Sequence, residues 1–286
     1  MRTRAIIDLV QLDDKKLFEE ISKGLNIIFE NMNTIYQHSV ELAKSDFSRG
    51  YRILNYIACE EAAKYLILLD LIRCDRLKKE FFSRQLKRFH EHLAKGIYFN
   101  YCDIKPAKFS DVFTWLEMKR KEYYLDGPIN FDWIFINWIF QQREECFYVD
   151  FVKYDDNYNW ISPQRYDENP ILLKPPYQPN IIKLVTSFNK IGLSNPNSLE
   201  LIAYKWRPIL IDKDFLWVKL CEINIDTLKI LKQNKLISKA DKSDIKNIIE
   251  LWLFPLYSID LNLIKVNKND LKAIQQNLLN HYNENI

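Results

Sequence analysis

Glycine is scarce in this sequence, which has only 5 glycines in 286 residues. Glycine-rich loops cradle phosphates in many nucleotide-binding α/β proteins, so this scarcity argues against such a sheet. A content of 48% hydrophobic and 14% aromatic residues argues against disorder. The composition therefore predicts a globular and mostly helical protein, long enough for one large domain or two of ordinary size.

Other features are missing as well. The formal net charge is only +3, so no global field indicates nucleic acid or an anionic membrane as a partner. None of the 5 cysteines stands in a CxxC pair, so we expect buried free thiols rather than a metal site or a disulfide framework. No apolar run reaches the about 18 residues of a membrane span, and the N-terminal apolar run is too short for a signal peptide. These absences predict a cytoplasmic protein with no membrane partner.

Hydrophobic residues recur every three to four positions over most of the chain, which predicts an all-α fold. In the N-terminal part we expect helices over 14–44, 47–73, 76–98, 108–124 and 131–145, and then a short extended segment. Prolines and turn formers between residues 155 and 180 indicate a surface connector. After it we expect helices over 181–192, 197–206, 213–235, 241–253 and 269–283. The expected organisation is a helical domain over 1–175 and a helical C-terminal region over 176–286.

The helix expected over 47–73 is apolar on most of its circumference, so its few charged residues need an explanation. Glu60 and Glu61 precede Lys64 by four and three positions, and each glutamate can therefore meet the lysine on one helical face. A simple surface salt bridge is one interpretation. The neighbouring apolar residues indicate a partly buried face, where a charge needs a partner, so a functional site is an equal alternative.

The helix expected over 76–98 is basic on one side. Arg84, Arg88 and His92 are spaced four apart, and Lys95 follows, so they would form a stripe on one face. His90 lies close by, and histidine is the side chain best suited to proton transfer near neutral pH. An arginine beside it can hold a phosphate and stabilise its developing charge. An ordinary basic surface helix is the alternative interpretation.

These segments resemble the AbiV family of abortive infection proteins, a branch of the HEPN superfamily. The matching motifs are Glu60-Glu61-Ala62-Ala63-Lys64, His92-Leu93-Ala94-Lys95, the stretch from Arg143 to Asp150, and Trp160-Ile161-Ser162-Pro163. The resemblance covers about residues 14–170. AbiV-like proteins usually have a glycine between the glutamate pair and the lysine, where this chain has Ala62-Ala63. The general HEPN pattern of an arginine followed by a histidine is met by Arg84 with His90, whereas the AbiV-like histidine is His92.

The resemblance implies an antiparallel helical bundle that acts as a homodimer. It implies a phage-defence protein that cleaves RNA without a metal or other cofactor and so arrests translation. The implied catalytic residues are a histidine base or acid, an arginine phosphate clamp and an acidic and basic pair beside them: His92, His90, Arg88, Arg84, Glu61 and Lys64. The implied RNA-binding residues are Lys95, Glu60, Arg143 and Tyr148.

Two questions stay open at this level. Arg143 could close one edge of the cleft with Tyr148 and Asp150, or form a structural ion pair with Asp150. The chain could also be a non-catalytic helical module that binds RNA or a protein and thereby blocks translation or phage development. In either case a phage-encoded or host protein could act as the trigger.

Overall fold

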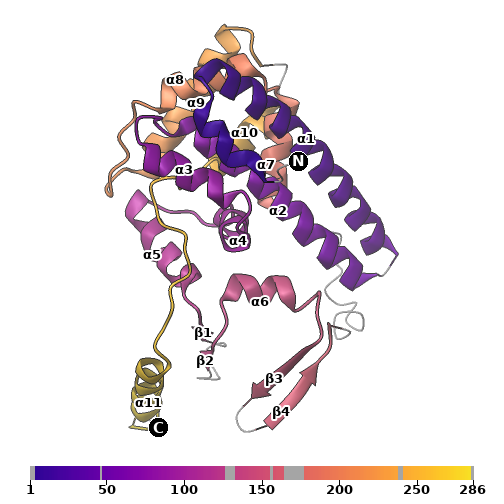
Figure 1. The fold of residues 1–286 in the computed structure, drawn as a ribbon, viewed down its shortest axis with the longest axis vertical. Coiled ribbons are helices and arrows are strands. Elements are labelled where there is room, and N and C mark those ends of the chain that lie inside the picture. The colour runs from indigo at the N-terminus through magenta and orange to yellow at the C-terminus, as the bar shows by residue number, and fades with distance from the viewer. Residues whose placement is uncertain are drawn as a thin grey trace.

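A long antiparallel helix pair forms the spine of the protein in the computed structural model (Figure 1). The structure describes residues 4–45, 47–125, 133–154, 157–163, 177–237 and 241–284. Helix α1 (Asp14–Lys44) begins at the cap Asp13, whose side chain accepts a hydrogen bond from the Lys16 backbone N–H at 2.9 Å. Helix α2 (Ser48–Arg73) follows and buries most of its second half. Both helices were predicted from hydrophobic periodicity, and both are confirmed.

The single helix predicted over 76–98 is wrong, because the chain forms two helices there. Helix α3 (Lys79–Arg88) ends in a tight turn, and α4 (His92–Tyr101) begins after it. Glu91, the residue before α4, is extended, with φ −86° and ψ 119°. The predicted stripe of Arg84, Arg88 and His92 on one helical face therefore does not exist. No glycine or proline marks this turn, so the periodicity alone could not reveal it.

The aromatic segment that follows is only partly helical. Helix α5 (Phe109–Arg120) is confirmed, but the helix predicted over 131–145 is wrong over 133–137, and its positions 131 and 132 lie outside the described residues. The short strand β1 (Tyr124–Leu125) pairs there with β2 (Trp133–Ile134), and α6 (Trp138–Glu144) begins only at the cap Asn137. The predicted extended segment is confirmed as β3 (Asp150–Tyr154). It forms a hairpin with β4 (Asn157–Ile161), which lies within the segment predicted as a surface connector, where no strand was expected.

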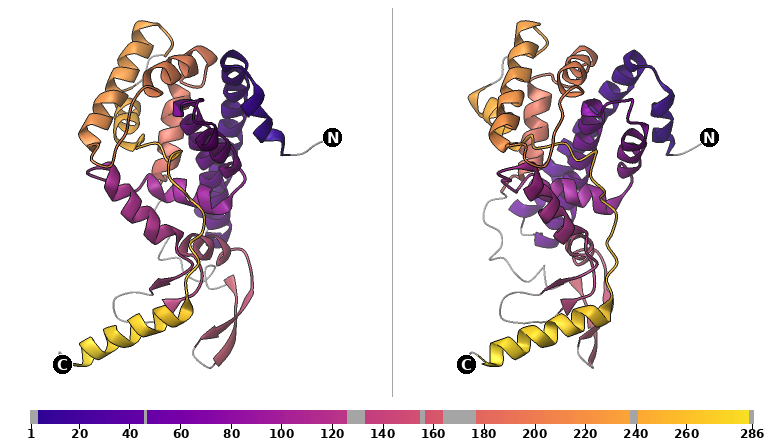
Figure 2. Two further views of the ribbon diagram at one scale, coloured as in Figure 1. Left: turned by 60° about the vertical axis from the view of Figure 1, so that its left-hand side comes forward. Right: turned by 90° about the vertical axis from the view of Figure 1, so that its left-hand side faces the viewer.

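Five helices form the C-terminal region of the described chain; the first two pack against the N-terminal pair, and the next two pack on those two. The five helices are α7 (Asn180–Lys190), α8 (Pro196–Trp206), α9 (Trp217–Gln233), α10 (Lys242–Leu251) and α11 (Lys268–Glu284). Residues from both predicted regions contribute to one buried hydrophobic cluster, and the predicted boundary near residue 175 lies outside the described residues. A 3₁₀ helix, η1 (Ala5–Gln11), precedes α1, and α11 extends away from the helical body (Figure 2).

The all-α fold class is confirmed, since helices form the body of the molecule and the strands form only two small two-stranded sheets among the described residues. Within the same residues, no helix has both the length and the apolar character needed to cross a membrane.

A non-helical segment between α10 and α11, residues 252–261, runs through the core and is almost entirely buried. We call it the strap. Because it is not helical, most of its backbone groups need partners from elsewhere, although the Ile259 N–H donates to the Leu256 carbonyl within the strap at 3.0 Å. Asp70 accepts the Leu256 N–H at 2.8 Å, and Arg73 donates to the Leu253 carbonyl at 3.0 Å. Arg88 donates to the carbonyls of Leu256, at 2.9 Å, and of Ile259.

These contacts form one buried polar network. Asp70 also pairs with Arg73 and accepts the Tyr98 hydroxyl at 2.6 Å. Gln85 donates to the same hydroxyl at 2.9 Å and accepts from Arg88 at 2.7 Å. The network therefore joins α2, α3 and α4 to the strap.

We expect the change of Arg88 to Met to destabilise the protein by about 3 kcal/mol, because it removes the Arg88 donor from the buried Ile259 carbonyl and from Gln85 Oε1, and leaves the Leu256 carbonyl with only the Ile259 N–H. Urea unfolding would measure the loss. Lys87→Met, at the exposed neighbouring position, is the control and should stay within about 0.5 kcal/mol of wild type. Equal stability of the two variants would contradict this role of Arg88.

Candidate functional site

The carboxylate of Glu60 is the centre of the most concentrated group of charges in the described chain. Its Oε1 lies 2.9 Å from His92 Nδ1 and 3.3 Å from Arg143 Nε. Its Oε2 accepts a hydrogen bond from Lys95 Nζ at 2.8 Å. We call these four residues the Glu60 cluster. The cluster brings together residues from three helices, from position 60 in α2 to position 143 in α6.

The local structure explains why these side chains meet. Glu60 lies in the middle of α2, on a face that α4 covers. His92 is the first residue of α4 and Lys95 lies three positions later, so both project from the same side of that helix. The turn before α4 thus sets the register that places both side chains over Glu60. Arg143 comes from the last turn of α6, which packs on α4.

The approach of α6 to α4 requires a glycine at position 96. A Cβ at Gly96 would lie 2.1 Å from Cγ2 of Ile139, which is far inside van der Waals contact. The Ile139 side chain is buried, and its carbonyl accepts a long hydrogen bond from Tyr56 at 3.5 Å. Gly96 therefore lets α6 come close enough for Arg143 to reach Glu60.

Burial distinguishes the members of the cluster. The side chains of Lys95 and Glu60 are 6% and 12% exposed, whereas that of His92 is 47% exposed. Burial of Glu60 acts to raise its pKa, but hydrogen bonds from Lys95 and His92 outweigh it and hold the pKa below the ordinary value. The ionised Glu60 faces two cations, so the cluster is positive overall even with a neutral histidine. His92 alone presents a titratable ring to solvent.

The other predicted residues on these helices lie beside the cluster. Glu61 forms an ion pair with Lys64, so of the two glutamates it is Glu61 that meets this lysine. His90 lies exposed in the turn between α3 and α4, with its ring edge-on to Phe89 at 5.3 Å. Burial and the nearby charges of Arg4, Lys64 and Lys95 lower the pKa of His90.

The remaining predicted residues lie elsewhere. Arg88 is 1% exposed and binds the strap, and Arg84 donates to the Tyr257 carbonyl at 3.0 Å, so neither guanidinium joins the Glu60 cluster. Tyr148 is exposed just after α6, with its ring 5.9 Å from that of Phe147. Arg143 forms its ion pair with Glu60, and the Asp150 carboxylate accepts the Phe151 N–H instead.

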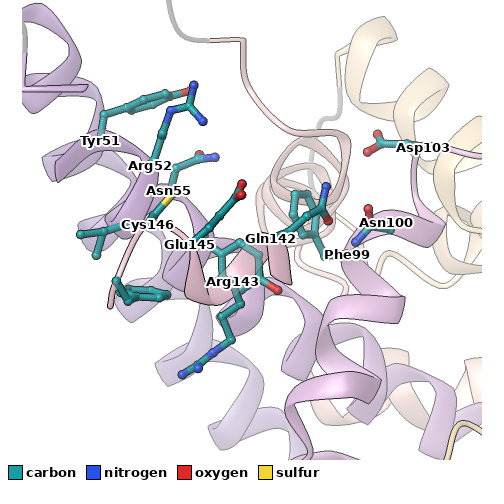
Figure 3. A pocket seen from close by; sticks show the side chains of 13 residues that line it. Tyr51, Arg52, Asn55, Phe99, Asn100, Asp103, Gln142, Arg143, Glu145 and Cys146 are labelled. Atoms are coloured by element: carbon teal, nitrogen blue, oxygen red, sulfur yellow. The ribbon is translucent and has the colours of Figure 1, made fainter. Parts of the chain in front are cut away.

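Sequence reasoning missed a cavity next to the cluster. It has a volume of about 340 Å³ and lies between α2, α6 and the end of α4 (Figure 3). Asn55 and Gln142 are among its lining residues, and their uncharged amides carry no signal in the sequence. Arg143 belongs to both the cavity wall and the Glu60 cluster.

Comparison with known proteins gives one match. The family model HEPN_AbiV, described as AbiV, matches residues 20–172, which is more than half of the chain. No curated protein and no solved structure gives a significant match. The matched region contains all four members of the Glu60 cluster. Among the described residues, no three side chains of His, Cys, Asp or Glu gather as metal ligands.

We expect Gly96→Ala to push α6 away from α4 and separate Arg143 from Glu60. The overpacking should cost about 1–3 kcal/mol and speed hydrogen exchange of the α6 amides. Gly24→Ala is the matched control, because a Cβ there would meet only Leu68 Cδ1 at 3.8 Å. This control should be stabilised by up to about 1 kcal/mol, as for alanine in a helix interior. Similar effects of both changes would argue against the close approach.

We expect Glu60→Gln to lower the free energy of unfolding by about 2 kcal/mol at neutral pH, since it removes the charged acceptor of Lys95 and His92. The lowered pKa of Glu60 means that its contribution is full above the ordinary glutamate pKa and is lost as the pH falls through the folded-state value. The difference in the free energy of unfolding between wild type and Glu60→Gln should therefore disappear at acidic pH. Glu20→Gln, which breaks an exposed pair with Lys23, is the control and should cost less than about 0.5 kcal/mol at any pH.

Proposed function

Because this chain belongs to the AbiV family of the HEPN superfamily, we propose that it is a phage-defence protein that cleaves RNA without a metal and so arrests translation in abortive infection. The family supports the defence role. The observation that carries the chemical proposal is the contact of an exposed histidine, His92, with a largely buried carboxylate, Glu60.

The geometry of this pair suits general base catalysis. A hydrogen bond from His92 Nδ1–H to Glu60 selects one tautomer and leaves Nε2 as the base. Nε2 would take the proton from an RNA 2′-hydroxyl, whose oxygen would attack the neighbouring phosphorus atom. The bond from phosphorus to the 5′-oxygen would then break, this oxygen would take up a proton from water, and His92 would release its proton to solvent. Glu60 is thus a positioning residue.

Cations are needed where charge develops on the phosphate. Arg143 is 22% exposed at the edge of the cluster and is the guanidinium placed to contact a phosphate beside His92. Lys95 is too buried for direct contact with the phosphate. It would act through its charge and through its ion pair with Glu60. In this proposal Arg88 and Arg84 support the fold of α3, while Glu61 and Lys64 form an ion pair beside the site. A homodimer would place two Glu60 clusters in one assembly.

A second candidate function is binding of RNA without cleavage. It is favoured by the burial of Lys95 and Glu60, which leaves His92 as the one well-exposed titratable group of the cluster. Such a protein would block translation by occupying RNA or a protein partner. The same experiment separates the two functions.

The test is the cleavage of labelled RNA by purified protein in excess EDTA. We expect His92→Ala to lower the cleavage rate by at least about a hundredfold, as for loss of a general base. His90→Ala is the matched control, since this histidine is two residues away, is also exposed and lies outside the Glu60 cluster. It should keep the rate within a few fold of wild type.

Equal activity of the two histidine variants would contradict the role of His92. RNA binding without cleavage by the wild-type protein, with phage protection that survives His92→Ala, would select the binding function instead. Arg143→Lys is a further variant for the same cleavage assay, because it keeps the charge but removes the planar guanidinium.

A further inference from the structure

The cavity beside the Glu60 cluster has the features of a small-ligand site. Its volume of about 340 Å³ lies within the range of such sites, roughly 300–1,000 Å³. Rings of Tyr51 and Phe99 contribute to its wall, together with polar side chains from α2 and α6. Aromatic walls with a few polar groups suit a flat ligand that is held by stacking and oriented by hydrogen bonds.

Two polar groups in its wall lack partners. The side-chain oxygens of Asn55 and Gln142 are buried and accept no hydrogen bond from any residue that the structure describes. Buried amides are normally paired, so these two oxygens at one cavity are the acceptors that a ligand would satisfy once the amides turn toward it. Each amide can rotate about its last torsion and so present either its oxygen or its NH₂ group.

The charge of the wall limits the ligand. Asp103 lies across the cavity from Asn55 (Figure 3) and accepts a hydrogen bond from Asn180 at 2.9 Å. The wall also contains Glu145, Arg52 and Arg143, so its two carboxylates and two guanidinium groups balance in formal charge and suit a neutral ligand with N–H donors. Arg143 extends from the cavity wall to Glu60, where a phosphate would lie in the proposed reaction.

We propose that this cavity binds one unstacked base of single-stranded RNA, and that it prefers a base with an exocyclic amino group over uracil. The amide oxygens of Asn55 and Gln142 accept from the amino group, and the aromatic side chains contact the base face. Arg143 then lies between the bound base and His92, so the cavity selects which phosphate is presented for cleavage. This inference rests on the proposed function, because it assumes an RNA substrate.

The test measures the affinity of four labelled heptanucleotides, UUUNUUU with N as A, C, G or U, for the His92→Ala protein, which should not cleave them. We expect at least one of the three amino-bearing bases to bind about tenfold tighter than uracil. The double variant Asn55→Leu with Gln142→Leu, made in the same protein, should lose this preference, so that the four RNAs bind with similar affinity.

The outcomes separate this inference from the proposed function. Equal affinity for all four RNAs, together with cleavage by the wild-type protein that depends on His92, would overturn the base pocket and leave the ribonuclease standing. A preference that survives the double change would also overturn it. Absence of any RNA binding would overturn both proposals.

A second measurement does not depend on the folding of the double variant. A heptanucleotide with 6-thioguanosine at the central position can be crosslinked to the His92→Ala protein by ultraviolet light. We expect the crosslink in peptides that line the cavity, such as those with Phe99 or Phe147. A crosslink confined to the exposed β3–β4 hairpin would overturn the base pocket.

Discussion

The need to satisfy the backbone of a buried non-helical segment is the constraint on which the rest of this structure depends. The strap is not helical, so Asp70, Arg73 and Arg88 supply partners to its backbone. Arg88 is the last residue of α3, and its attachment to the strap fixes the point where α3 ends. The chain then turns, and α4 begins with His92 over Glu60. A contact in the core thereby determines the register of the candidate site.

Periodicity predicted the elements that depend on local pattern. The faces of α1 and α2 repeat every three to four residues over many turns, and the structure confirms both helices. The turn between α3 and α4 was missed because tertiary contacts impose it, without glycine or proline. The segment after α5 was misjudged for a related reason. Its aromatic residues suit a helix or a strand, and pairing of β1 with β2 decides its first half.

The candidate site was predictable in its residue types and less so in its pairings. The motifs included Glu60, His92, Lys95 and Arg143 among the predicted residues, but the prediction gave the catalytic role to Glu61 and only RNA binding to Glu60. The difference between the two glutamates depends on which side of α2 the helix α4 covers. A buried arginine looks like a surface arginine in a sequence, so Arg88 entered the predicted stripe although its guanidinium belongs to the core. Asn55 and Gln142 could not be found at all, since uncharged amides occur throughout helical surfaces.

The charges of the cluster suggest how stability and chemistry are combined in one place. A buried lysine needs an acidic partner, and Lys95 obtains it from Glu60. The same carboxylate contacts His92 and Arg143. The group that stabilises the buried lysine therefore also orients these two more exposed side chains. With one carboxylate against two cations, the site keeps a positive charge toward solvent. An anionic phosphate would then be attracted to the edge of the cluster, while the neighbouring cavity, whose two carboxylates and two arginines balance in formal charge, would suit the neutral base of the proposal.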